Sequence, residues 1–408
     1  PIRSIGWNQD RLYSIESTMR KQNVSIGLFI LLFSFTTVMA GENVKGQVRQ
    51  LLQTETLKRA DAALESVPMT VTATRAERSA GGIHDFYSEG DYWWENPQNP
   101  AGPFIRRDGE TNPDNFTAHR HAMIRFSQLV GDLTSAWILT GDKKYTDAAM
   151  RHIRAWFIDQ KTMMNPNLLY AQAIKGIATG RGIGIIDTIH LIEVAQSLRL
   201  MEAQGIIEDK ELQTIRLWFS DYLTWLSTHR YGINEMEAKN NHGTCWTMQV
   251  AAFASFTQNE EMLRFCRERY RSVLLPNQMA ADGSFPLELE RTKPYGYSLF
   301  NLDAMTTLCH LLTTPEENLW DYTTTDGRNI EKGISWLFPF VKDKGSWQRQ
   351  PDIMFWEEWP VAHPFLLFGS LHHYRKEYFQ TWKQLEHFPT NEEVIRNLPI
   401  RHPLLWLN

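Results

Sequence analysis

The residues best suited to chemistry are Asn240-Asn241-His242, which Arg291 and Tyr297 follow later in the chain. An amide and an imidazole can neutralise a carboxylate, which makes the proton on the neighbouring carbon more acidic. A phenol can take that proton as a base and return a proton to a leaving oxygen. The positive charge of Arg291 favours the phenolate form of such a group. Together these residues predict β-elimination from a uronic acid.

Each of these residues, taken singly, also fits a structural role. An Asn of the triplet can cap the helix that follows it, and His242 can pack against Trp246. Arg291 can pair with the acidic residues just before it, and Tyr297 can be a core aromatic. The prediction of a reactive site therefore rests on their combination.

Composition narrows the classes of function. The chain has 408 residues, of which 42% are hydrophobic and 22% charged, as in an ordinary globular protein. Its net charge of −5 gives no basic excess for nucleic acid, so an anionic partner would need a local cationic cleft. The three cysteines form no CxxC pair, which indicates buried thiols, and we expect neither a metal nor a cofactor.

The N-terminal region carries a pattern typical of export. Met19-Arg20-Lys21 is basic, residues 26–35 are apolar, and Val38-Met39-Ala40 ends in small residues. We predict a signal peptide over residues 19–40, preceded by an upstream extension over 1–18 and followed by one domain over 41–408. The alternative is an uncleaved N-terminal anchor. Cleavage would give a periplasmic or secreted protein that leaves the membrane.

Helical periodicity dominates the remaining sequence, and the alternation of apolar and polar residues that is typical of β-strands is scarce. Short connections rich in Gly, Asn, Asp or Pro separate successive segments. The pattern predicts an all-α fold of helical hairpins that curve into an (α/α) toroid or incomplete barrel. Residues 79–115 are irregular and aromatic, which is typical of a functional loop. The expected helices are Val44–Ala63, Ile124–Leu139, Tyr145–Phe157, Gly184–Glu202, Lys210–Ser227, Trp246–Phe256, Glu260–Leu275, Tyr297–Leu312, Gly333–Val341 and Pro364–Tyr378.

Several stretches, read together, resemble the alginate lyase superfamily of polysaccharide lyases. They include Asp85-Phe-Tyr87-Ser-Glu-Gly-Asp-Tyr92-Trp-Trp94, Asn165-Pro-Asn167-Leu-Leu-Tyr170, Gly182-Ile-Gly184-Ile-Ile-Asp187 and the Asn-Asn-His triplet, within residues 81–310. The resemblance implies the helical-toroid fold and cleavage of a 4-linked polyuronate.

The same resemblance implies roles for individual residues. Asn241 and His242 would neutralise the uronate carboxylate, and His242 could also be the base for one epimer. Arg291 would assist Tyr297, which would act as base and acid. The spacing after Arg291 leaves Tyr295 as a rival to Tyr297.

Further residues are candidates for binding the polysaccharide. Sugar rings stack on aromatic faces, and basic or amide side chains can bind uronate carboxylates. A capped, solvated helix start is an equal alternative for the cluster His119-Arg120-His121. The substrate-binding candidates are Tyr92, Trp93, Trp94, His119, Arg120, His121, Gln172, Lys175, Trp246 and Tyr295.

The first expected substrate is mannuronate-rich alginate, and glucuronan is the second. One alternative is an (α/α)-barrel glycoside hydrolase, which needs two carboxylates beside the bond that it cleaves. Its candidates are Glu288, Glu290, Glu357 and Glu358. The other alternative is a glycan-binding protein of helical repeats that has no catalytic activity.

Overall fold

The computed structural model describes residues 43–373 and 375–407. The predicted upstream extension and signal peptide, residues 1–40, lie outside this part of the chain. The features discussed below belong to the unit Arg49–Asn408, except that the first helix begins at residue 43, before that unit. Among the described residues, no helix combines the length and the apolar character needed to span a membrane.

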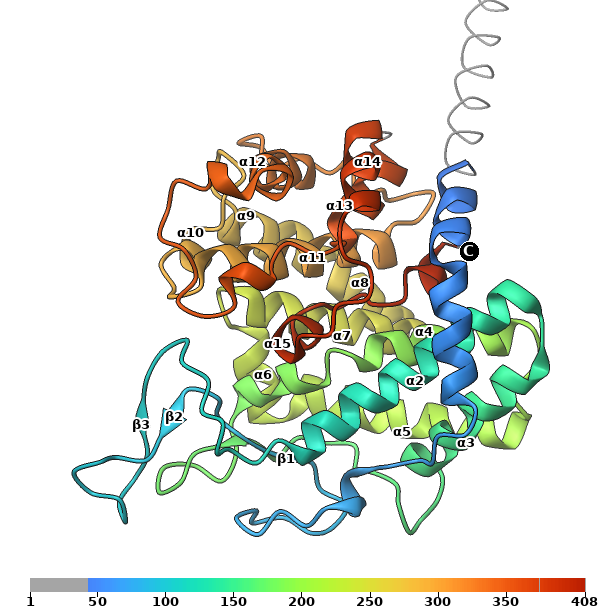
Figure 1. The fold of residues 1–408 in the computed structure, drawn as a ribbon, viewed down its shortest axis with the longest axis vertical. Helices are drawn as coiled ribbons and strands as arrows, with labels where there is room; N and C mark the ends of the chain where they lie inside the picture. Colours follow the sequence, from blue (N-terminus) through green and yellow to red (C-terminus); the bar gives the residue numbers. More distant parts are fainter. Residues whose placement is uncertain (1–42, 374, 408) are drawn as a thin grey trace, which may run out of the picture. The chain divides into compact units, whose positions relative to one another are not determined.

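Helices make up most of the structure, and the all-α prediction is confirmed (Figure 1). A first helix covers residues 43–63. Those that follow are α2 (Ala118–Thr140), α3 (Lys143–Phe157), α4 (Leu191–Ala203), α5 (Asp209–Thr228), α6 (Arg230–Met236), α7 (Asn241–Thr257), α8 (Glu260–Arg269), α9 (Leu275–Gln278), α10 (Pro286–Leu289), α11 (Pro294–Leu312), α12 (Ile330–Lys342), α13 (Pro364–His372), α14 (Lys376–Gln384) and α15 (Glu392–Arg396).

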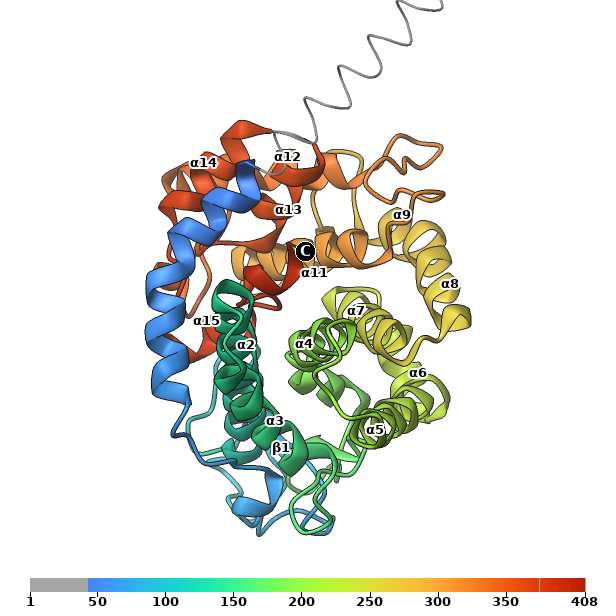
Figure 2. The same ribbon diagram turned by 90° about the vertical axis from the view of Figure 1, so that its right-hand side faces the viewer.

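The helices pack as hairpins in two layers, which is the predicted toroid architecture. In the inner layer α2 contacts α4, α4 contacts α7, α7 contacts α11, and α11 contacts α13. Their partners α3, α5, α8, α12 and α14 lie outside them, as Figure 2 shows. A 3₁₀ helix near the C-terminus, η6 (Pro403–Trp406), returns to α2 and α4.

Helices α7 and α11 are buried along nearly their whole length. Neither shows a strong apolar stripe, because packing on several sides calls for small or apolar residues all round. In the N-terminal turns, His242 on α7 and Tyr297 on α11 are only partly buried, whereas polar residues further along α11, such as Asn301 and Asp303, are fully buried. These turns are therefore the places where the two central helices can present chemistry.

The irregular segment before α2 contains short strands. β1 (Tyr87–Glu89) pairs in parallel with β4 (Tyr170–Ala173), and β2 (Trp93–Trp94) pairs with β3 (Ile105–Arg106). The β1–β4 register shifts between Tyr87 and Glu89, so β4 carries an extra residue. A bulge of this kind redirects side chains locally.

Some predicted boundaries were wrong. Helix α7 begins at Asn241, before the predicted start at Trp246, because its polar first turn lacks apolar periodicity. The expected helix Gly184–Glu202 is the 3₁₀ segment η2 (Gly182–Thr188) followed by α4. A Cβ on Gly184 would lie 2.5 Å from the Cβ of Ala171, so this glycine permits η2 to approach β4 closely. The expected helix Pro364–Tyr378 divides into α13 and α14.

Candidate active site

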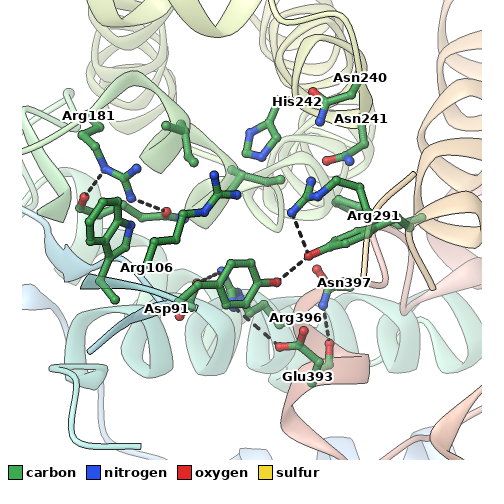
Figure 3. A pocket seen from close by; sticks show the side chains of 17 residues that line it. Asp91, Arg106, Arg181, Asn240, Asn241, His242, Arg291, Glu393, Arg396 and Asn397 are labelled. Carbon is green, nitrogen blue, oxygen red and sulfur yellow. Dashed lines mark hydrogen bonds and ion pairs between the residues drawn. The ribbon is translucent and has the colours of Figure 1, made fainter. Parts of the chain in front are cut away.

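A cleft of about 280 Å³ lies at the N-terminal turns of α7 and α11 (Figure 3). The β2–β3 hairpin, the segment around η2 and the C-terminal helix α15 form its other walls. Its polar lining includes both members of the predicted carboxylate-binding pair and the predicted tyrosine. The lining residues are Asp91, Tyr92, Trp93, Arg106, Gln172, Arg181, Ile183, Ile186, Asn240, Asn241, His242, Arg291, Tyr297, Phe300, Glu393, Arg396 and Asn397.

Asn241 is held in place by a buried carboxylate. Glu288 accepts hydrogen bonds from the Asn241 backbone N–H (2.6 Å) and from its side-chain amide (2.8 Å). Burial raises the pKa of Glu288 above its usual range, although these two hydrogen bonds oppose the rise. Glu288 thus satisfies the first turn of α7 and fixes the orientation of the Asn241 amide.

His242 pairs with a second buried carboxylate. Its Nδ1 lies 2.6 Å from Oε1 of Glu235, and its ring lines the cleft. Burial alone would lower the pKa of His242, but the charge and hydrogen bond of Glu235 outweigh burial and raise the pKa. His242 is therefore biased toward the imidazolium form, with Nε2 left for a ligand.

Tyr297 lies among hydroxyl and cationic groups. Its hydroxyl oxygen is 2.6 Å from that of Tyr92 and accepts a hydrogen bond from Arg291 at 3.4 Å. The Arg291 guanidinium also sits over the Tyr297 ring, 4.5 Å from its centroid. Lys293 lies 5.5 Å from the same centroid. Two cations therefore flank the phenol.

These cations do not make Tyr297 acidic in the unliganded site. Burial raises the pKa of Tyr297 well above its usual value, Tyr92 adds to the rise, and Lys293 and Arg291 oppose it. The sequence prediction that Arg291 favours the phenolate is right in sign, but its effect is smaller than that of burial. Arg291 is also paired with Asp108 at 3.1 Å, which offsets part of its charge.

The C-terminal segment supplies one wall of the cleft. Glu393 of α15 forms an ion pair with Lys293 at 2.6 Å. Arg396 pairs with Asp91 at 2.5 Å and lies 3.7 Å from Asp187. Through these contacts α15 joins the loop before α11 to the segment that leads into β2.

Three of the predicted substrate-binding residues line the cleft: Tyr92, Trp93 and Gln172. Trp94 and Lys175 do not line it. The Trp94 indole donates to the Glu110 carbonyl, and Lys175 donates to the Pro100 carbonyl.

The structure places His119-Arg120-His121 away from this cleft. His119 is buried, accepts the Tyr87 backbone N–H at Nδ1 and bonds the Thr74 carbonyl through Nε2. Arg120 is buried in ion pairs with Asp91 and Asp187. His121 is exposed beside Glu392 and, with Arg120, lines a second hollow that shares Asp91, Glu393 and Arg396 with the cleft.

Trp246 and Tyr295 belong to the core. Both are fully buried, and each donates to a backbone carbonyl, Trp246 to Leu226 and Tyr295 to Phe340. Residues two apart on a helix point about 200° from each other, so Tyr297 faces the cleft while Tyr295 faces inward. Neither Trp246 nor Tyr295 is placed to touch a substrate in this cleft.

The carboxylates proposed for a hydrolase do not flank the cleft. Glu288 is tied to Asn241, while Glu290, Glu357 and Glu358 are exposed on the surface. None of the four lines the cleft. Among the described residues, no three His, Cys, Asp or Glu side chains are grouped as a metal site.

Sequence reasoning missed several lining residues, above all Arg106, Arg181, Glu393 and Arg396. In the sequence, an isolated charged residue in a predicted loop shows no difference between a position that faces solvent and one that faces a cleft. The Gly182-Ile-Gly184 run could have drawn attention to Arg181, because glycines mark a close approach of backbone there.

Comparisons with known proteins identify the family of the chain. The family model described as Alginate lyase matches residues 70–347. A crystal structure of an alginate lyase from Bacteroides ovatus has a TM-score of 0.75 and 29% identity, covering 90% of this chain and 97% of that one.

Alginate lyase A1-III from Sphingomonas species A1 shares the fold at 15% identity, with a TM-score of 0.53 and coverage of 85% and 90%. A tyrosine-to-phenylalanine variant of A1-III, complexed with a tetrasaccharide, matches at 15% identity with a TM-score of 0.55, covering 89% and 94%. A search of curated proteins gave no significant match. Since the family model spans well over half of its length, the chain belongs to the alginate lyase family and is a polysaccharide lyase.

Proposed function

We propose that this enzyme cleaves alginate by β-elimination, with Tyr297 as base and acid and with Asn241 and His242 neutralising the uronate carboxylate. The observation that carries the proposal is the meeting of the two helix N-termini at one cleft. One brings an amide and an imidazole, and the other brings a phenol beside Arg291. Mannuronate-rich alginate is the first substrate, and glucuronan is the second.

The elimination breaks two bonds and forms one double bond. A base removes the C5 proton, the C4–O4 bond breaks, and the electron pair forms the C4=C5 double bond. The departing O4 then takes a proton. Neutralising the carboxylate at C5 lowers the energy of the carbanion-like transition state. This is the role that we propose for Asn241 and His242.

The protonation states favour a division of labour between the two helices. His242 has a raised pKa, so its imidazolium form suits a carboxylate ligand better than proton removal. Tyr297 rests as a neutral phenol, so it must first release its own proton to solvent. The phenolate then takes the C5 proton and gives it to the departing O4, which restores the phenolate. Arg291 and Lys293 favour the initial release, and the Tyr92 hydroxyl can donate a hydrogen bond to the phenolate.

The test compares Tyr297→Phe with Tyr295→Phe on alginate, following the ultraviolet absorbance of new unsaturated uronates. Removing the Tyr297 hydroxyl should lower kcat by at least about a thousandfold, since both proton transfers depend on it. Tyr295→Phe removes a buried hydroxyl outside the cleft and should keep nearly full activity. Similar activity in both variants would overturn the assignment.

A substrate panel separates this proposal from its rivals. The enzyme is incubated separately with polymannuronate, polyguluronate and glucuronan, and the product masses are measured by mass spectrometry. Reducing ends without unsaturated products would indicate hydrolysis, and binding without turnover would indicate a glycan-binding protein. Unsaturated products from polymannuronate at the highest rate would support the proposed preference.

Export is part of the same proposal, since the polymer is too large to enter a cell unaided. It is supported by the basic and apolar pattern over residues 19–40. N-terminal sequencing of protein recovered outside the cytoplasm should begin at Gly41. A full-length N-terminus on the recovered protein would contradict cleavage there.

A further inference from the structure

The basic side chains of the cleft differ in whether they already have an acidic partner. Arg291 and Arg106 both bind Asp108, and Arg396 pairs with Asp91. His242 has Glu235. Among the described residues, no carboxylate lies within ion-pair distance of Arg181, whose side chain hydrogen-bonds to Gln172 and lies over the Trp93 ring, 5.8 Å from its centroid.

Gln172 holds Arg181 through an unusual backbone conformation. Its φ is 48°, in the left-handed region that non-glycine residues rarely adopt, and it lies in the bulged strand β4. This conformation turns the Gln172 carbonyl toward Arg181 Nε, at 2.8 Å, and its side-chain oxygen toward a terminal nitrogen, at 3.3 Å. Backbone strain of this kind persists where the surroundings hold a functional group in position.

Arg181 is fixed in place without being satisfied as a cation. Two of its five N–H donors are used, both by neutral oxygens of Gln172. Burial lowers the pKa of Arg181 and the like charge of Arg106 lowers it further, while the carboxylates of Asp91, Asp187 and Glu235, beyond ion-pair distance, oppose only part of this. A carboxylate bound here would relieve both effects, because it supplies the missing opposite charge in a partly desolvated site.

The position of Arg181 indicates which carboxylate that would be. Figure 3 shows Arg181 at the end of the cleft away from Arg291, with Arg106 between them. The uronate that loses its C5 proton must place its own carboxylate at Asn241 and His242. In a polyuronate every neighbouring sugar carries a carboxylate as well.

We propose that Arg181, with Arg106 beside it, binds the carboxylate of the uronate adjacent to the one that loses its proton. This inference rests on the proposed function, because it assumes that the Asn241–His242 end holds the reacting sugar. Arg181 is then a specificity-determining residue: it makes the enzyme select a run of uronates over a uronate next to a neutral sugar.

The experiment uses polymannuronate in which part of the carboxylates has been reduced to neutral alcohols. Wild type, Arg181→Gln and Arg107→Gln are compared, and product ends are sequenced by mass spectrometry. Arg107 is a matched control, since it stacks on Trp94 outside the cleft and carries the same charge. Arg181→Lys, which keeps the charge but not the fork of donors, is the second variant.

Wild type and Arg107→Gln should cut rarely where a neutral sugar adjoins the reacting uronate on the Arg181 side. Arg181→Gln should cut there as often as the neutral sugar occurs in the polymer. On unmodified polymannuronate its KM should rise about ten- to a hundredfold, the effect of losing one charged hydrogen bond, with kcat within about threefold. Arg181→Lys should fall between wild type and Arg181→Gln.

Wild-type KM and unchanged selectivity in Arg181→Gln would overturn the inference. A merely structural role would also overturn it, and would appear as a lower melting temperature and lower kcat with selectivity intact. Failure of the proposed function is a separate result, because wild type itself would then release no unsaturated products.

Discussion

Burial and nearby charge set the protonation states of individual residues in the candidate active site. Glu235 keeps His242 biased toward the cation, and burial keeps Tyr297 neutral. A cationic imidazole suits the proposed binding of a carboxylate, whereas the neutral phenol has to release its proton before it can act as the proposed base. The sequence identifies these residue types, but it cannot show which buried carboxylate lies beside each of them.

The pH dependence of Glu235→Gln tests the role of His242. If the imidazolium binds the carboxylate, kcat/KM should fall as pH rises through the pKa of His242. Removing the charge of Glu235 lowers that pKa, so the falling limb should move to lower pH. The position of this falling limb is measured from steady-state rates on polymannuronate at a series of pH values.

Glu237→Gln is the matched control, because it removes the same charge from an exposed position two residues away. Its profile should follow wild type. If His242 were instead the base, activity would rise through its pKa, and Glu235→Gln would move a rising limb to lower pH. The direction of the limb therefore distinguishes the two roles.

The first turn of α11 depends on a residue that is distant in sequence. The residue before α11, Lys293, gives no side-chain cap. Asp352, in the loop before α13, caps the helix instead. Its carboxylate accepts hydrogen bonds from the backbone N–H groups of Tyr295 (2.8 Å) and Gly296 (2.9 Å). Burial raises the pKa of Asp352 to about 6, and the two hydrogen bonds oppose the rise. The cap lies beside Tyr297, so it positions the proposed catalytic phenol.

Asp352→Ala should lower the free energy of unfolding by about 1–2 kcal/mol, the usual effect of losing a helix cap. It should also lower kcat, because the turn that carries Tyr297 loses its anchor. Asp352→Asn keeps one acceptor oxygen and should lose less of both. Urea unfolding at pH 7 and steady-state rates measure the two effects, and an alanine variant as stable as wild type would contradict the capping role.

Helix positions could be predicted from the sequence more completely than the site. Amphipathic segments such as α3 and α5 follow from apolar spacing alone. The early start of α7 depends on a tertiary contact, that of Glu288 with Asn241, which the sequence does not reveal. Arg181 was missed because its significance depends on having no acidic partner within ion-pair distance among the described residues, which the sequence does not reveal.

Buried ion pairs connect distant parts of the folded unit. Asp91 precedes β2 and contacts Arg120 of α2 and Arg396 of α15. Glu393 joins α15 to Lys293 before α11. Helix α15 lies beyond the family match, which ends at residue 347, yet it helps to close the cleft. The C-terminal segment therefore forms part of the candidate active site.

Arg396→Gln tests this connection through stability. Burial would raise the pKa of Asp91, but Arg120 and Arg396 outweigh burial and hold it at about 2, below its usual 3.8. The pKa is depressed on folding, so the resulting stabilisation is present above about pH 4 and is lost as pH falls through about 2. Removing Arg396 leaves Asp91 with Arg120 alone, which should lower the free energy of unfolding by about 3 kcal/mol at pH 7.

The pKa of Asp91 in the folded variant should move back toward its usual value, so the free energy of unfolding should depend less steeply on pH between about 4 and 2. Urea unfolding at a series of pH values measures both the loss and the slope. Arg154→Gln, which breaks an exposed pair with Glu211, should cost less than about 1 kcal/mol and keep the wild-type slope. Equal losses in the two variants would mean that α15 is held by apolar packing and that its ion pairs contribute little.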